Sequence, residues 1–138
     1  MKTVLSGIRS TGHLHLGNYY GALLNFVQLQ NTAKCFFFIA DLHSLTTHPK
    51  PDDFHSNVKI ILAEYLAAGL DPEKSSLFVQ SSVPEVSELY VLLNMLSYKG
   101  ELERTASFKD KVRQNPDNVN AGLLTYPVLM ASDILIHR

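Results

Sequence analysis

An apolar strand pattern followed by a helical pattern occurs three times in the amino-terminal two-thirds of the chain. The strand patterns are "MKTVLSG" from residue 1, "CFFFIA" from residue 35 and "SLFVQSS" from residue 76. Each is followed by apolar residues at helical spacing. This alternation predicts right-handed crossovers between parallel strands, and therefore an α/β fold in which a doubly wound, three-stranded parallel sheet carries helices on both faces.

Helix start and stop signals lie between these patterns. Pro51, followed by two aspartates, opens the second helix, and Gly69 closes it. Ser82 and Glu85 match an S-x-x-E capping box, which predicts a third helix running to about Leu96. The apolar residues of the second helix are expected to share one face, made of Phe54, Val58, Ile61, Leu62, Tyr65 and Leu66.

Length and composition limit the class of protein. A chain of 138 residues with 46% hydrophobic and 18% charged residues suits one soluble globular domain. It has no apolar run of about 18 residues, so we expect no membrane partner. The single Cys35 and the lack of a secretory signal predict a cytoplasmic protein. A net charge of −1 gives no sign of general polyanion binding.

Small and polar residues follow each predicted strand. The three stretches are "GIRSTGH", "ADLHSLT" and "VQSSVP". In open parallel sheets ligands bind beyond the carboxyl ends of the strands, so these stretches are predicted to line a ligand site.

Two common phosphate-binding motifs do not fit the first of these stretches. Gly7 and Gly12 satisfy G-x-x-x-x-G, but His13 and Leu14 stand where a phosphate loop needs Lys and Ser or Thr. The sequence also contains no G-x-G-x-x-G. Neither a phosphate-loop enzyme nor a dinucleotide-binding protein is therefore indicated.

The segment His15-Leu16-Gly17-Asn18 falls at the start of the first predicted helix. Free amide groups and the helix dipole favour an anion there. Gly17 would let a nucleotide approach the backbone, and His15 and Asn18 could donate hydrogen bonds to phosphate oxygens. The alternative is an ordinary glycine-containing turn with surface histidines.

A third set of candidate residues lies near the carboxyl end of the chain. Tyr126, Met130 and Asp133 have the i, i+4, i+7 spacing that places side chains on one helix face. An aromatic ring, a thioether and one carboxylate suit an indole, whose polar atom is an N–H donor. The alternative is a helix in which Tyr126 and Met130 are core residues.

These segments together resemble the class I aminoacyl-tRNA synthetases, and within that family the tryptophan enzymes. His15 to Asn18 is similar to the HIGH signature, with Leu16 for the Ile and Asn18 for the second His. "GELERTASFKDK" at 100–111, "GLLTYPVLMASDIL" at 122–135 and "ADLHSLT" extend the likeness over nearly the whole chain. The resemblance implies a Rossmann-like fold, with residues 1–138 as the amino-terminal part of the catalytic domain.

The resemblance assigns roles in tryptophan binding. Asp133 would accept the indole N–H, and Tyr126 and Met130 would contact the ring. Tyrosine enzymes, the nearest rivals, tend to carry Gln where this chain has Met130. Gly7 would pack its bare backbone on the indole or adenylate, and His43 would lie near the amino-acid pocket.

The resemblance also assigns roles in ATP binding to Arg9, Lys111 and the His15 corner. Lys111 would approach the phosphates, although the surrounding run "YKGELERTASFKDKVR" can equally be a solvated basic face. Arg9 would face the amino acid and phosphates, where many relatives carry Gln. Ser10 replaces a common Pro, which leaves the detail of that contact open. "GELER" would lie near the contact of a homodimer.

The implied reaction is attack of the tryptophan carboxylate on the α-phosphorus of ATP, with Mg²⁺ on the leaving pyrophosphate, followed by transfer to tRNA(Trp). Such chemistry depends on positioning and charge stabilisation by His15, Asn18 and Lys111. We predict no metal ligands in the chain itself.

The second signature of the family, K-M-S-K-S, does not occur in the sequence. We therefore expect a truncated catalytic domain, without the remaining strands and the anticodon-binding region, that is poorly active alone. Three alternatives stay open: a non-catalytic tryptophan- or ATP-binding or dimerising fragment, a tyrosine-specific relative, and a related nucleotidyltransferase.

Overall fold

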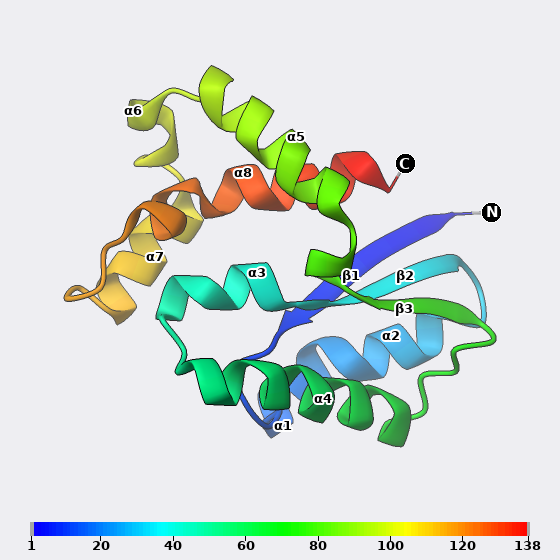
Figure 1. Cartoon of the computed structure of the whole chain (residues 1–138). Helices are drawn as coiled ribbons and strands as arrows, with labels where there is room; N and C mark the ends of the chain where they lie inside the picture. Colours follow the sequence, from blue (N-terminus) through cyan, green and yellow to red (C-terminus); the bar gives the residue numbers. More distant parts are fainter. Residues whose placement is uncertain (1, 138) are drawn as a thin grey trace. The chain divides into compact units, whose positions relative to one another are not determined.

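The computed structural model describes residues 2–137, which divide into two compact units. Unit 1 comprises the residues up to Ser44 together with Pro49–Ser82, and unit 2 comprises Leu45–His48 together with the residues from Val83 onward. Unit 1 contains β1 (Thr3–Arg9), α1 (Leu16–Asn18), the π-helical turn η1 (Tyr19–Leu23), α2 (Leu24–Leu29), β2 (Lys34–Ala40), α3 (Asp41–Ser44), α4 (Pro51–Ala67), β3 (Ser75–Val79) and the 3₁₀ turn η3 (Gln80–Ser82) (Figure 1). Unit 2 contains the 3₁₀ turn η2 (Leu45–Thr47), α5 (Pro84–Leu96), α6 (Lys99–Leu102), α7 (Ala106–Gln114) and α8 (Ala121–Ile136).

The sheet of unit 1 confirms the predicted three parallel strands. Its order is β1-β2-β3, with β2 in the middle. Both crossovers step in the same direction along the sheet, and right-handed connections then place both crossover helices on one face. Figure 1 shows α2 and α4 together on that face. The predicted Rossmann-like parallel sheet with crossover helices is confirmed. Both crossover helices of unit 1 lie on one face because the strand order does not reverse, and helices on the second face stay a prediction.

The core of unit 1 lies between the sheet and these two helices. Alternate residues of β2 point into it, and Phe37 is fully buried and stacks on Phe26 with ring centroids 4.4 Å apart. Ile61 and Tyr65 meet them from α4. The neighbouring residues Leu62 and Leu66, predicted on the same apolar face, are 38% and 46% exposed and therefore lie at its solvent edge. Each follows a buried residue by one position, which turns it about 100° away around the helix axis.

The predicted capping box at Ser82 does not form. Ser82 Oγ donates to the Val79 carbonyl at 2.6 Å, and Val83 is the N-cap of α5 without a side-chain cap. Pro84 occupies the first turn of α5, where its missing N–H costs nothing. The helix therefore begins one residue later than the S-x-x-E pattern requires, although its end at Leu96 is as predicted.

Unit 2 is a group of helices in which α5 packs against α8. The Tyr90 hydroxyl and Thr125 Oγ1 are 2.6 Å apart across this contact. Asn120 caps α8 by accepting from the Leu123 N–H at 3.0 Å, and its amide donates to the Thr46 carbonyl at 2.9 Å. Among the described residues no helix has the length and apolar character needed to cross a membrane.

Candidate functional site

The ends of β1 and β2 are joined by two buried serines. The backbone N–H of Ser10 donates to Ser44 Oγ at 2.9 Å, and Ser44 Oγ donates to the Ala40 carbonyl at 2.8 Å. Both serines have no exposed surface. The chain leaving β1 is therefore held against the short helix that follows β2.

A second set of hydrogen bonds joins the ends of β2 and β3. Asp41 Oδ1 accepts from the backbone N–H groups of Leu42 at 2.9 Å and Ser81 at 3.0 Å. Gln80 Oε1 accepts from the His43 N–H at 3.4 Å. These hydrogen bonds, together with the bond between Ser10 and Ser44, join the polar stretches after the three strands, which therefore meet as predicted. Asp41, His43 and Gln80 are all buried. Sequence reasoning missed the structural roles of Asp41 and Gln80, although a polar residue directly after an apolar strand is a usable signal.

The predicted anion corner forms a reciprocal capping box. His15 Nδ1 accepts from the Asn18 N–H at 3.3 Å, and Asn18 Oδ1 accepts from the His15 N–H at 3.2 Å. An acceptor Nδ1 places the ring proton of His15 on Nε2. The exposed imidazole therefore presents Nε2–H, and Asn18 keeps its amide N–H groups as donors.

Gly17 has a steric role that the sequence did not predict. A Cβ at this position would lie 2.9 Å from both Nδ1 and Cε1 of His15. Any larger residue would therefore push the His15 ring out of the capping box. Close approach of a nucleotide to Gly17 stays a prediction.

Gly7 lies in β1 opposite Phe38 of β2. A Cβ at Gly7 would lie 2.7 Å from the Phe38 carbonyl oxygen and 2.8 Å from the Phe38 ring. Close packing between the strands thus accounts for this glycine, and its contact with a ligand stays a prediction. Arg9 is the last residue of β1 and is half-buried.

In unit 2, Lys111 and Tyr126 lie together. The Lys111 ammonium is 4.4 Å from the centroid of the Tyr126 ring, a cation–π contact between α7 and α8. Other basic residues of the same run pair with acidic residues of their own helices: Lys99 with Glu103 at 2.8 Å and Arg113 with Asp110 at 3.6 Å. Those pairs are exposed, as expected of a solvated face, whereas Lys111 is half-buried.

The remaining candidates of α8 differ in burial. Asp133 is 4% exposed and Met130 is 44% exposed. Tyr126 is half-buried. All three residues lie in α8, and that they form one ligand-binding face stays a prediction. Residues 2–137 contain no group of three His, Cys, Asp or Glu that could hold a metal ion.

Comparison with known proteins gives a match over the whole chain. The family described as tRNA synthetases class I (W and Y) matches residues 1–138. The tryptophan–tRNA ligase of Porphyromonas gingivalis is 67% identical over 138 residues, and that of Rickettsia conorii is 50% identical over 137 residues. The matches cover 100% and 99% of this chain but 42% of each relative, so the chain spans about two-fifths of their length.

Solved structures agree with these sequence relatives. Tryptophanyl-tRNA synthetase from Mycoplasma pneumoniae has a TM-score of 0.89 at 43% identity, covering 99% of this chain and 40% of that one. The Campylobacter jejuni enzyme complexed with ADP and tryptophan has a TM-score of 0.87 at 41% identity, covering 97% and 41%. A tyrosyl-tRNA synthetase from Archaeoglobus fulgidus shares the fold, with a TM-score of 0.80 at 17% identity, covering 96% and 42%. The full-length family match, the identity with these relatives and the parallel sheet with its His15 corner show that this chain belongs to the class I tRNA synthetases of the tryptophan and tyrosine type.

Proposed function

We propose that this chain supplies ATP- and amino-acid-binding residues of an enzyme that activates L-tryptophan and transfers it to tRNA(Trp). The observation that carries the proposal is the capping box of His15 and Asn18 at the start of α1, which leaves the His15 Nε2–H and the Asn18 amide as donors. The choice of tryptophan is supported by relatives at 67% and 50% identity, both tryptophan–tRNA ligases, and by the complex of the Campylobacter enzyme with ADP and tryptophan.

Unit 1 would act mainly on the nucleotide. His15 Nε2–H and the Asn18 amide would donate to phosphate oxygens; the capping box and the space that Gly17 leaves for the His15 ring support this assignment. Arg9 would add a fixed positive charge near the phosphates. Mg²⁺ would enter with ATP, because this ion keeps several waters and binds through substrate phosphates. Gly7 and His43 would contribute to amino-acid binding.

Unit 2 would act on the indole and on the phosphates. The buried Asp133 carboxylate can accept the indole N–H, with Tyr126 and Met130 as the apolar contacts. Lys111, which lies over Tyr126, would stabilise phosphate charge.

The proposed chemistry forms a bond between the tryptophan carboxylate and the α-phosphorus of ATP and breaks the bond to the β-phosphate. Pyrophosphate leaves. A hydroxyl of the terminal ribose of tRNA then attacks the carbonyl carbon of the adenylate and forms the aminoacyl ester, while the acyl–phosphate bond breaks, AMP leaves and the hydroxyl proton is released. The residues named here hold the groups in line and stabilise negative charge, and no general base is required in the first step.

A homodimer in the cytoplasm is part of this proposal. The end of α5 and the turn after it expose several large apolar side chains, which are Leu92 at 63%, Met95 at 78%, Leu96 at 76% and Tyr98 at 74%. An apolar patch of this kind fits a subunit contact. The patch directly precedes α6, which overlaps the first residues of the "GELER" segment at 100–104.

A second candidate is a non-catalytic fragment that binds tryptophan or ATP. These 138 residues contain no K-M-S-K-S, so taken by themselves they support ligand binding rather than turnover. Such a chain would bind ligand without turning it over.

The test is exchange of labelled pyrophosphate into ATP by the native gene product that carries this sequence, with tryptophan or tyrosine as the amino acid. We expect exchange that depends on tryptophan and is lost in His15→Ala. Tryptophan binding without exchange would support the non-catalytic candidate, and exchange with tyrosine would overturn the substrate.

A further inference from the structure

A glutamate of α4 binds the segment that leads into the His15 corner. The two carboxylate oxygens of Glu64 are used separately: Oε1 is 2.8 Å from His13 Nδ1, and Oε2 accepts from the Leu14 N–H at 2.9 Å. Because a carboxylate can only accept, Nδ1 of His13 carries the proton in this contact. The Glu64 side chain is 27% exposed, so water competes less for it than for a surface carboxylate.

The Glu64 contact is one of three hydrogen-bonded positions along the segment between β1 and α1. Ser10 is held by Ser44, Leu14 by Glu64 and His15 by Asn18. Gly12 lies between the first two positions with a φ of 108°, a conformation that suits glycine. The segment is therefore fixed by side chains of α3 and α4 and by the first turn of the helical run that starts at Leu16 and continues through η1 and α2 to Leu29.

A cavity brings Glu64 and His15 into one lining. It has a volume of about 350 Å³, and its wall also includes Leu14, Tyr19 and Ala67. Because the cavity lies beside the His15 imidazole, packing against neighbouring side chains does not fix the orientation of this ring. Its orientation must come from hydrogen bonds, namely the capping box and the backbone that Glu64 holds.

We propose that Glu64 is a positioning residue for His15. By binding the Leu14 N–H, it holds the backbone next to the N-cap so that Nδ1 of His15 meets the Asn18 N–H and Nε2–H points outward as a donor. The inference rests on the proposed function of His15 in phosphate binding, but its structural part can be measured without any activity.

The structural part predicts different tautomers for two neighbouring histidines. In the wild-type chain, ¹⁵N NMR of the histidine rings should show the proton of His13 on Nδ1 and that of His15 on Nε2. Glu64→Ala should leave the fold intact by circular dichroism and bring the His15 nitrogens toward the averaged shifts of a free imidazole. Glu64→Gln keeps an oxygen acceptor for Leu14 and should restore the His15 signature. Glu88→Ala removes an exposed helical glutamate of α5 and should change nothing.

The effect of Glu64 on activity is measured with the native gene product. Glu64→Ala should lower the rate of adenylate formation between about tenfold and a hundredfold, with a smaller change in the KM for ATP, because misplacing a donor costs more in the transition state. Glu64→Gln should recover most of that rate.

The outcomes separate this inference from the proposed function. An unchanged His15 signature in folded Glu64→Ala would overturn the positioning role. A changed signature with unchanged exchange would keep the positioning role and reject phosphate binding by His15. If Glu64→Ala does not fold, Glu64→Gln and Glu64→Asp take its place in the test. Loss of the His15 tautomer signature in Glu64→Gln would overturn the proposal. An intact signature in Glu64→Asp, whose side chain is shorter, would also overturn it.

Discussion

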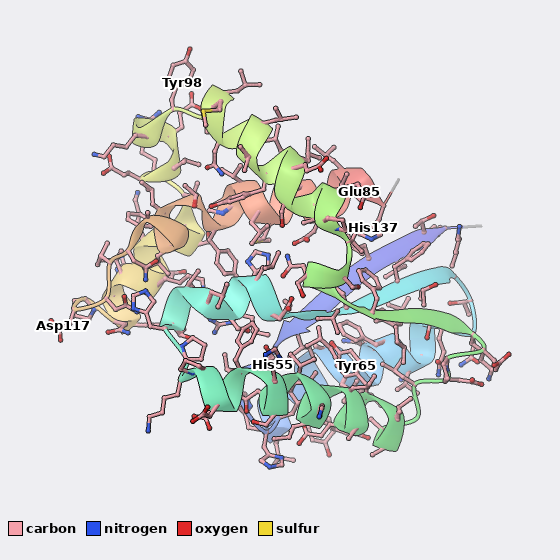
Figure 2. The ribbon with its side chains drawn as sticks, viewed as in Figure 1. His55, Tyr65, Glu85, Tyr98, Asp117 and His137 are labelled. Atoms are coloured by element: carbon pink, nitrogen blue, oxygen red, sulfur yellow. The ribbon has the colours of Figure 1, made fainter. Side chains whose placement is uncertain are left out.

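The phenol oxygen of Tyr65 accepts a hydrogen bond from the backbone N–H of Ile8 at 3.0 Å. The same hydroxyl donates to the Phe38 carbonyl at 3.1 Å. A side chain of α4 therefore bridges backbone groups of β1 and β2 (Figure 2 shows Tyr65 on α4). Because Tyr65 has no exposed surface, water cannot replace it.

Tyr65→Phe should destabilise the protein without changing its fold. It leaves a buried N–H and a buried carbonyl without this partner, at a cost of about 1–3 kcal/mol. Urea unfolding followed by circular dichroism measures the difference. Tyr20→Phe is the matched control, because Tyr20 is 65% exposed. Equal stability of the two variants would contradict the bridging role.

Stability should fall at alkaline pH because of the same residue. Burial raises the pKa of Tyr65 well above its ordinary value. The contribution of the protonated phenol is complete below the unfolded pKa of about 10 and is lost as the pH rises above it, since the unfolded chain then releases the proton more readily. Denaturation midpoints between pH 8 and pH 11 test this, and the decline should be smaller in Tyr65→Phe. A decline of equal size in both would assign it to other groups.

Gly17→Ala should damage activity more than stability. The new methyl group would lie 2.9 Å from the His15 ring, and the exposed ring can move away at little cost. We expect adenylate formation to fall nearly as far as in His15→Ala, with a free energy of unfolding within about 1 kcal/mol of wild type. Gly21→Ala is the control, because its Cβ would meet no atom within 4 Å. Full activity of Gly17→Ala would show that the capping box is dispensable.

Asp133→Ala should weaken tryptophan binding. Loss of a hydrogen bond to a charged acceptor costs about 1.5–3 kcal/mol, which corresponds to roughly a tenfold to 150-fold higher Kd. Calorimetry with tryptophan measures the change. Asp117→Ala, in the exposed loop before α8, is the control (Figure 2). A change under twofold in Asp133→Ala would remove this residue from the binding site.

Lys111→Met should slow adenylate formation more than Lys109→Met. Lys111 is half-buried over Tyr126, whereas Lys109 is exposed on the same helix. Removal of one charge-stabilising donor typically costs 10²–10³ in rate. Single-turnover assays of the native gene product compare the two variants. Similar rates would mean that the basic run acts only as a solvated surface.

Much of unit 1 could be predicted from the sequence because its signals are local. The apolar run before Asp41, the proline that opens α4 and the alternation of strand and helix each depend on residues close together in the chain. The same reasoning found the helix start at His15. The S-x-x-E pattern, however, predicted a capping box at Ser82 that does not form, because the helix begins at Pro84. The capping box that His15 and Asn18 do form was not predicted.

Contacts between residues that are distant in the chain were decided by the tertiary structure alone. Tyr65 reaches Ile8 across 57 positions, and Glu64 reaches Leu14 across 50. No local pattern encodes such pairs, because they arise only when right-handed crossovers bring α4 onto the same face of the sheet as α2. The sequence by itself determined which segments become strands and helices and which polar residues end them. Which of those residues hold His15 in place was decided by packing, since a hydrogen bond in the core depends on where two elements meet and not on either element alone.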